Sequence, residues 1–138
     1  MKIYTFKGIQ KKGEEEIDVN GYFNILPKEY EFKIPISGKF IIKKEKMLYE
    51  VKGDLTSLLI GQNPSLSFFT RKDDLEFAYE LQPVNFEKEI ITYKGNYISS
   101  KDLTAESLLV FMSGVKIEGA NEIILDLTVD ESFKNLLL

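Results

Sequence analysis

A strict alternation of apolar and polar side chains in the middle of the chain constrains its fold most. Large apolar residues take every second position there: Leu75, Phe77, Tyr79 and Leu81. Charged or small residues fill the positions between them: Glu76, Ala78 and Glu80. Because successive side chains of a β-strand point to opposite faces, this spacing predicts a strand with one buried and one polar face. We therefore expect the core to be built mainly from a β-sheet.

Alternating segments of the same kind occur along most of the chain. Two of them, 34–40 and 48–59, surround the charged sequence Lys43-Lys44-Glu45-Lys46, which predicts an antiparallel hairpin. The sequence Gly61-Gln62-Asn63-Pro64 predicts a turn. Gln82-Pro83 is expected to end the strand at 75–81, because proline donates no hydrogen bond to a sheet. Further strands are predicted at 2–9, 16–25, 90–93 and 123–129.

Helical spacing is confined to the last third of the chain. One apolar stripe follows the i, i+3, i+4, i+7 pattern of an α-helix: Ala105, Leu108, Leu109 and Met112. Either Asp102 or Thr104 can cap its start, and Gly114 can take the left-handed conformation after its end. Asp130 is expected to cap a short C-terminal helix.

Together these elements predict one domain that spans residues 1–138. Its expected class is α+β and β-rich: an antiparallel sheet or a partly closed barrel, with one helix near 103–113 and a short C-terminal helix. The choice between an open sheet and a barrel stays open at this point.

The composition excludes most familiar enzyme chemistry. The chain has no His and no Cys, so it has no Ser–His–Asp triad, no thiolate nucleophile and no zinc site of the usual sulfur type. No glycine-rich phosphate loop is present, and the carboxylates at Asp126 and Asp130 are most simply read as solvated or capping groups. We therefore expect no enzyme activity, no cofactor and no metal.

Charge and hydropathy narrow the class of partner. With 18 basic and 22 acidic residues the net charge is −4, and Arg71 is the single arginine, so sequence-specific DNA binding is not expected. No stretch approaches the apolar length of a membrane span, and the N-terminal residues lack a secretory pattern. The expected location is the cytoplasm, with no membrane partner.

Basic residues gather around the predicted hairpin tip. They are Lys39, Lys43, Lys44 and Lys46, with Lys52 on the returning strand. Such lysines could bind a phosphate backbone with salt-dependent affinity, or could simply be solvated charges that prevent association between sheets. Both interpretations stay open.

Phe68 and Phe69 form a second candidate contact. Adjacent residues of an extended segment point to opposite faces, so a single core cannot bury both rings. One of the two is therefore a candidate apolar anchor for a partner.

Three parts of the sequence resemble motifs of a known family. The first is IPISGKF at 34–40 with LYEVKGDLTSL at 48–58, the second is GNYI at 95–98 with DLTAESLL at 102–109, and the third is VDESFKNLL at 129–137. In this order they resemble motifs of the YceD-like proteins, bacterial and plastid proteins linked to accumulation of large-subunit ribosomal RNA. The resemblance implies a ribosome-biogenesis factor that binds ribosomal RNA precursor or a ribosomal protein. The cysteine element of that family has no counterpart here, because residues 60–64 read IGQNP.

A second, shorter resemblance leads to a different class. Residues 81–86, LQPVNF, are similar to a hexapeptide of SecB-type export chaperones. The sequence hypotheses are therefore a non-enzymatic binding protein of ribosome biogenesis or, alternatively, a protein–protein interaction module such as a chaperone, phage component or inhibitor. The acidic net charge favours a basic ribosomal protein over bare RNA as the partner of the first.

Overall fold

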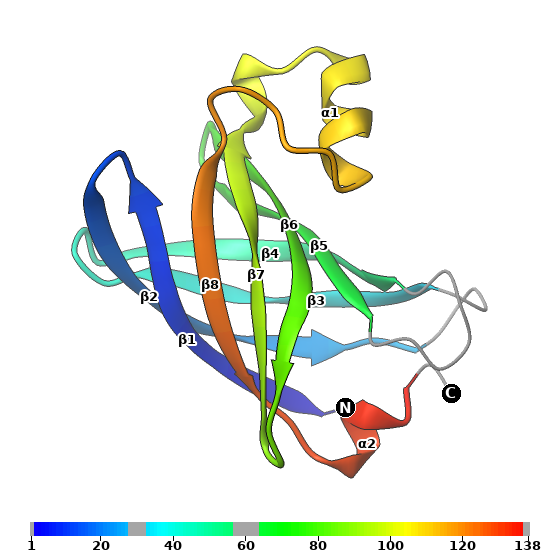
Figure 1. Cartoon of the computed structure of the whole chain (residues 1–138). Coiled ribbons are helices and arrows are strands. Elements are labelled where there is room, and N and C mark those ends of the chain that lie inside the picture. Colours follow the sequence, from blue (N-terminus) through cyan, green and yellow to red (C-terminus); the bar gives the residue numbers. More distant parts are fainter. Residues whose placement is uncertain (1, 28–32, 57–63, 137–138) are drawn as a thin grey trace.

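The computed structural model describes residues 2–27, 33–56 and 64–136. Its eight strands form a closed antiparallel barrel in chain order, in which the last strand pairs with the first (Figure 1). The strands are β1 Ile3–Lys12, β2 Glu15–Ile25, β3 Lys33–Ile42, β4 Met47–Thr56, β5 Ser65–Lys72, β6 Leu75–Phe86, β7 Ile90–Ser99 and β8 Asn121–Thr128. A 3-10 turn, η1 Ser100–Asp102, precedes α1 Ala105–Met112, and α2 Glu131–Lys134 follows β8.

The predicted α+β class is wrong, because this sheet buries its apolar face by closing on itself. Phe6 of β1 lies opposite Leu127 of β8, and this pairing joins strands that stand far apart in the sequence. The helices are only 8 and 4 residues long and form no layer across a sheet. Alternation is the same in an open sheet and in a barrel, so it could not predict this closure.

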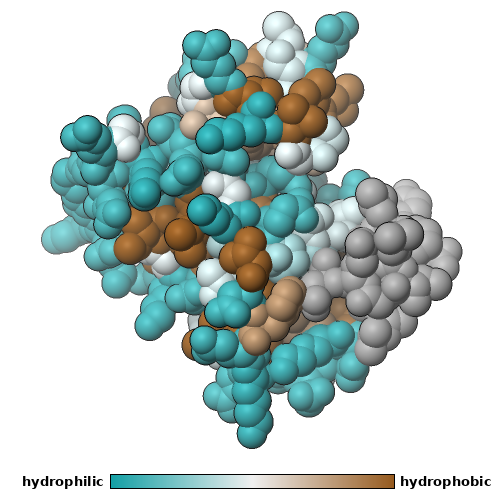
Figure 2. Space-filling model, viewed as in Figure 1, coloured by the Kyte–Doolittle hydropathy of each residue, from teal (hydrophilic) through white to brown (hydrophobic). Residues whose placement is uncertain are grey.

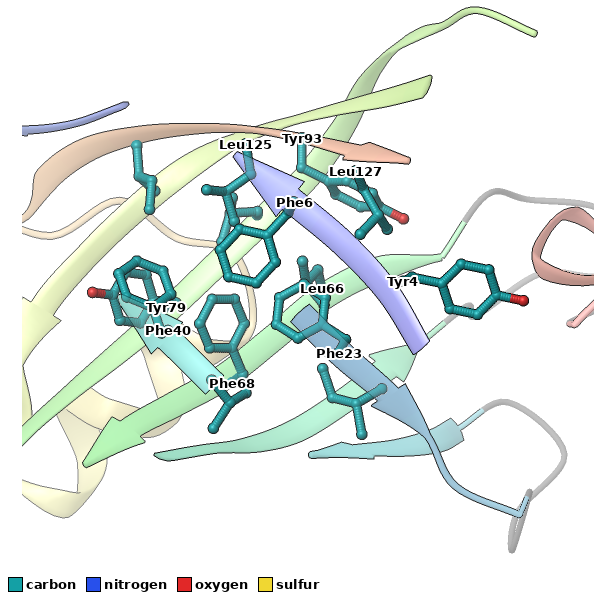
Figure 3. Close-up of a cluster of buried hydrophobic side chains, with 14 of the residues drawn as sticks. Tyr4, Phe6, Phe23, Phe40, Leu66, Phe68, Tyr79, Tyr93, Leu125 and Leu127 are labelled. Carbon is teal, nitrogen blue, oxygen red and sulfur yellow. The ribbon is translucent and has the colours of Figure 1, made fainter. Parts of the chain in front are cut away.

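Side chains fill the interior of the barrel, and aromatic rings dominate it (Figure 3). Phe68 stacks on Tyr79 with ring centroids 4.6 Å apart, and Tyr79 stacks on Tyr97 at 5.3 Å. Phe6 and Phe23 form another stacked pair at 4.6 Å. Phe77 packs against this core, so the predicted inward direction of residues 77 and 79 is confirmed.

The tyrosine hydroxyls inside the barrel have hydrogen-bond partners. Tyr79 donates to Gln10 Oε1 at 3.2 Å, Tyr97 to the carbonyl of Lys11 at 2.6 Å, and Tyr93 to the carbonyl of Pro64 at 2.9 Å. Burial raises the pKa of Tyr97 to about 12. These interactions let a core rich in tyrosine stay packed without unpaired hydroxyls at those positions.

Two predicted strand ends lie inside strands instead. β6 continues through Pro83 to Phe86, with a register irregularity between Pro83 and Asn85 that accommodates the missing donor. β7 continues through Gly95, where a Cβ atom would come within 1.9 Å of the Glu80 carbonyl oxygen. Gly95 is therefore a close-approach site rather than a strand end. The predicted turn residues 61–63 lie outside the described part of the chain.

A second, smaller apolar cluster lies on the outside of the barrel beneath α1. Its buried members are Ala78, Ile98 and Phe111, and Phe69 packs against them. Neighbouring strands place three of these residues side by side, since Phe69 pairs with Ala78 and Ala78 with Ile98. The helix therefore covers a patch of the outer wall of β5, β6 and β7.

The ends of α1 have the predicted capping residues, but its buried face agrees with the prediction only in part. Thr104 caps α1 by accepting from the amide of Ser107 at 3.1 Å, and Gly114 has φ +99° after its end, which confirms both assignments. Phe111 is buried, and the predicted Leu108 and Met112 pack against the same cluster, whereas the predicted Ala105 and Leu109 are exposed, Leu109 to 73%. Because residues 108–112 are all apolar, spacing alone could not decide which side faces the barrel.

The helix α2 packs against one end of the barrel, near the start of the chain. Asp130 accepts from the amide of Phe133 at 2.9 Å, which confirms it as the cap of this helix. The same carboxylate pairs with Lys2 at 2.6 Å and accepts from the Tyr4 hydroxyl at 3.0 Å. The Lys2 ammonium lowers the pKa of Asp130 to about 2. The Phe133 ring meets the Tyr4 ring edge-on at 5.1 Å.

Candidate binding surfaces of the barrel

The architecture limits where a partner could bind. Every strand is paired on both sides, so no free strand edge among the described residues can accept an added strand. The interior is occupied by side chains such as Phe40, Phe68 and Tyr79, each at most 1% exposed. Surfaces for partners therefore lie on the outer wall, in its grooves and under α1.

The predicted basic tip is partly neutralised by acidic neighbours. Lys39 forms an ion pair with Glu50 on β4, and Lys44 forms one with Glu15 on β2. Lys43 is exposed at the turn, beside Lys46, which has φ +53°. Because two of the lysines of this hairpin are ion-paired with glutamates, it offers fewer free positive charges to a phosphate backbone than the sequence indicates.

Lys46 and Lys43 take part in no ion pair among the described residues. Their side chains therefore remain the two candidates for phosphate contact at the tip. Lys52 lies elsewhere, on the outer face of β4, and belongs to a different surface.

A broad groove crosses the outer faces of β3, β4 and β5, with a cavity volume of about 780 Å³. Lys52 lies directly opposite Phe69 in the strand register, and Ser37 lies opposite Lys52 on its other side. Leu26 and Pro35 add apolar surface to its lining. The structure thus brings together two of the residues that the sequence singled out, one cationic and one aromatic.

The groove presents one unpaired cation. Lys52 is exposed and takes part in no ion pair among the described residues. Asp54, which also lines the groove, pairs with Lys33 at 3.6 Å. The groups available to a partner are therefore the Lys52 ammonium and the neighbouring Phe69 ring. They suit a partner that carries a carboxylate next to an apolar side chain.

The two adjacent phenylalanines have different environments. Phe68 points into the barrel and is fully buried. Phe69 points outward, packs against the cluster beneath α1 and lines the groove. The barrel interior buries Phe68 and the cluster beneath α1 covers Phe69, so β5 can shield a ring on each of its faces. A single core could not cover both.

A smaller recess lies between the outer wall of β6 and β7 and the segment after α1, with a volume of about 140 Å³. Glu80 points into this region and is only 7% exposed, although it faces away from the barrel interior. It accepts hydrogen bonds from Ser67 Oγ and, at 2.9 Å, from Gln82 Nε2. Burial nevertheless raises the pKa of Glu80 to about 7.

Sequence reasoning missed Glu80, because it treated the outer face of this strand as solvated. A signal was present: Ala78 and Ile98 are apolar at outward positions, which indicates a cover over that face. The neighbouring glutamate could have been placed under the same cover. In the described part of the chain, no group of three acidic, Cys or His side chains is arranged to hold a metal ion.

Apolar side chains are also exposed on the far side of α1. Leu109 is 73% exposed and Val110 44% exposed, and Figure 2 shows apolar atoms on the surface of this part of the molecule. Val84 and Phe86, within the hexapeptide similar to SecB-type chaperones, are 56% and 50% exposed. No helix in the described ranges has the length and apolar character needed to cross a bilayer.

Comparison with known proteins supports the fold. No family model and no curated protein matches the chain. A solved structure described as EF1p2_mFAP2b bound to DFHBI matches with a TM-score of 0.60 and 10% sequence identity, over 93% of this chain and 91% of that one. At this identity the likeness shows that the two chains share a fold.

Proposed function

We propose that the chain is a non-enzymatic binding protein that holds an extended segment of a partner protein in the groove over β3, β4 and β5. The observation that carries the proposal is the direct opposition of Lys52 and Phe69 across two strands of that groove. A carboxylate on the segment would pair with Lys52, and a neighbouring apolar side chain would pack against Phe69.

The size and position of the groove support this mode. Its volume of about 780 Å³ lies within the range of about 300 to 1,000 Å³ that is usual for ligand pockets, so it can accommodate side chains of a partner. Because the closed barrel offers no strand edge in the described residues, recognition has to rest on side chains rather than on backbone pairing.

Capture of the partner with matched variants tests the proposal. Immobilised wild-type protein, Lys52→Glu, Ser37→Phe and Lys43→Glu are each incubated with lysate, and the proteins retained are identified and then titrated as purified components. Lys52→Glu reverses the charge of the groove, and Ser37→Phe fills its floor without changing charge. Lys43→Glu makes the same charge change outside the groove.

We expect both groove variants to weaken the purified complex at least about tenfold, the equivalent of one hydrogen-bonded charge pair. Lys43→Glu should bind like the wild type. Loss of binding in Lys43→Glu with retention in the groove variants would move the interface to the hairpin tip and refute the proposal.

The resemblance to the YceD-like proteins supports a narrower proposal, that the partner protein is a large-subunit ribosomal protein; ribosomal RNA precursor, the other partner that the resemblance implies, would contact the hairpin tip instead of the groove. The net charge of −4 favours the basic protein, because long-range attraction then speeds association. A purified partner that is neither ribosomal protein nor ribosomal RNA, yet binds saturably in the groove, would refute this narrower proposal and leave the groove assignment intact.

A further inference from the structure

We propose that the recess between β6, β7 and the segment after α1 binds a small zwitterion, a molecule with one ammonium and one carboxylate group such as glycine or alanine. The site is separate from the groove over β3, β4 and β5 and does not depend on the function proposed for that groove. Its lining includes Glu80 and Asn96 from the strands and Lys116 from the segment after α1.

The floor of the recess is rich in hydrogen-bond acceptors. Glu80 is buried there and receives two donors, from Ser67 and Gln82. An ionised carboxylate can accept about four hydrogen bonds, so half of its capacity remains. An ammonium group could use that capacity, because it carries three donors and a compensating charge.

Asn96 supplies a second acceptor beside the first. It lies directly opposite Glu80 in the register of β6 and β7. Its Oδ1 atom is buried and has no hydrogen-bond partner within the described residues. A buried carbonyl oxygen without a donor is costly, and a ligand donor at this position would satisfy it.

Two lysines line the recess, and they supply the opposite charge. Lys94 comes from β7 and Lys116 from the segment after α1. Neither takes part in an ion pair among the described residues. Acceptors on the floor and ammonium groups on the lining match a ligand whose positive and negative ends lie a few atoms apart.

The volume restricts the ligand to a small molecule. About 140 Å³ corresponds to roughly five water-sized groups at about 30 Å³ each. Glycine and alanine are of this size, whereas a large side chain would have to extend out of the recess.

The fold holds the upper wall of the recess in place. Phe111 of α1 is 2% exposed and lines the recess, and Gly114 ends the helix with φ +99°. The amide of Val115 donates to the carbonyl of Val110 at 3.4 Å, which turns the following segment back over the strands. The wall therefore exists before a ligand arrives.

The protonation of Glu80 links binding to pH. Its raised pKa, about 7, reflects burial without a paired cation. An arriving ammonium group favours the ionised carboxylate, so binding near neutral pH should release a proton. A merely structural role of Glu80 would not make proton release depend on an added amino acid.

Calorimetric titration with four probes tests the proposal. Glycine and L-alanine carry both charged groups, ethylamine lacks the carboxylate, and acetate lacks the ammonium. Each is titrated into wild-type protein, Glu80→Gln, Lys116→Met and the control Glu118→Gln, in two buffers of different ionisation enthalpy. Glu118 is exposed and does not line the recess. Circular dichroism checks that each variant is folded.

We expect glycine or alanine to bind the wild type and Glu118→Gln at millimolar concentration or below, with buffer-dependent heat that reports proton release. Ethylamine and acetate should each bind at least about tenfold more weakly. Glu80→Gln should lose zwitterion binding, and Lys116→Met should weaken it severalfold.

Three results would overturn the proposal. They are no binding of either amino acid to the wild type, equal binding of ethylamine and alanine, or unchanged alanine binding in Glu80→Gln. If Glu80→Gln does not fold, unchanged alanine binding in Lys116→Met would overturn the proposal, and this variant should fold because Lys116 is exposed on the surface.

Discussion

The interior of the barrel and the cluster beneath α1 are both apolar cores, yet they arise in different ways. The interior draws residues from all eight strands, and its aromatic rings are stacked on one another. The outer cluster has three buried members, Ala78, Ile98 and Phe111. A large core formed by many strands resists local opening, whereas a small core under one short helix opens more easily.

The two regions also differ in how their buried polar groups are paired, which bears on where a ligand could bind. Inside the barrel the tyrosine hydroxyls of Tyr79, Tyr93 and Tyr97 are paired with protein acceptors. Beneath the segment after α1, a carboxylate with a raised pKa lies beside an unpaired amide oxygen, at Glu80 and Asn96. A buried carboxylate that titrates near neutral pH is typical of functional sites, and Glu80 of the recess is such a group, which is why we place ligand chemistry outside the barrel.

The largest effect on stability is expected from a substitution in the interior core. Phe68→Ala removes a fully buried ring that stacks on Tyr79, and we expect the free energy of unfolding to fall by about 4 to 5 kcal/mol. Phe86→Ala removes the same side chain where it is 50% exposed and should cost under about 1 kcal/mol. Denaturant unfolding measures both, and equal losses would contradict the distinction between interior and surface.

A smaller effect is expected from the outer core. Phe111→Ala should lower the free energy of unfolding by about 3 kcal/mol, because fewer side chains surround this ring. Hydrogen exchange should show loss of amide protection in α1 while the strand amides keep theirs. The control Leu109→Ala alters a side chain that is 73% exposed and should leave α1 protected. Simultaneous loss of protection in the barrel strands would show that the two cores form one cooperative unit.

The pH dependence of stability is expected to depend on Glu80, which lies outside the barrel interior. The pKa of Glu80 is about 7 in the folded protein and 4.5 as an unperturbed group, so the folded state binds more protons between these values. The free energy of unfolding should therefore fall by about 2 to 3 kcal/mol as pH rises from about 4.5 to about 7, and then level off.

Thermal and denaturant unfolding from pH 4 to 8 check this slope. Ser67, Gln82, Asn96, Lys94 and Lys116 are the polar and charged groups around Glu80, and Glu80→Gln leaves all of them in place. That variant should remove most of the slope, and Glu118→Gln should keep it. A wild-type curve that rises through this window would contradict a neutral, buried Glu80.

Asp130 gives an opposite dependence at lower pH. Its pKa is lowered to about 2 by Lys2, so its contribution to stability is present above its ordinary pKa of 3.8 and is lost as pH falls through about 2. This range does not overlap that of Glu80, so the two carboxylates can be distinguished in one pH series.

The smallest effect on stability is expected at the hairpin tip. Lys43→Ala with Lys46→Ala should change the free energy of unfolding by less than about 0.5 kcal/mol, because both side chains are exposed. The same variant tests RNA contact by filter binding to large-subunit RNA across a salt series. Unchanged affinity, or no measurable affinity at low salt, would rule out phosphate contact by these lysines.

Much of the local structure could be predicted from the sequence. Alternation at 75–81 predicted which side chains point inward, and capping chemistry predicted Thr104, Gly114 and Asp130. These features depend on neighbours a few residues away, so their physics is contained in short segments. The prediction failed where a strand passed through Gly95, because the reason for that glycine is a carbonyl on another strand.

The candidate sites were predictable only in part. Lys52 and Phe69 were singled out, but their opposition in one groove is a property of strand register. Glu80 was not singled out, because its burial depends on a helix more than twenty residues later in the chain.

By itself the sequence determined the alternation of the strands, the helix caps and the absence of imidazole and thiol chemistry, because each is a matter of residue type and short spacing. Only the tertiary structure decided that β8 meets β1, that the barrel fills with aromatic rings, and that a carboxylate on its outer wall is buried. Those outcomes depend on contacts between residues distant in the chain. The free energy of such contacts depends on strand register and on how all the surrounding side chains pack, which short segments do not determine.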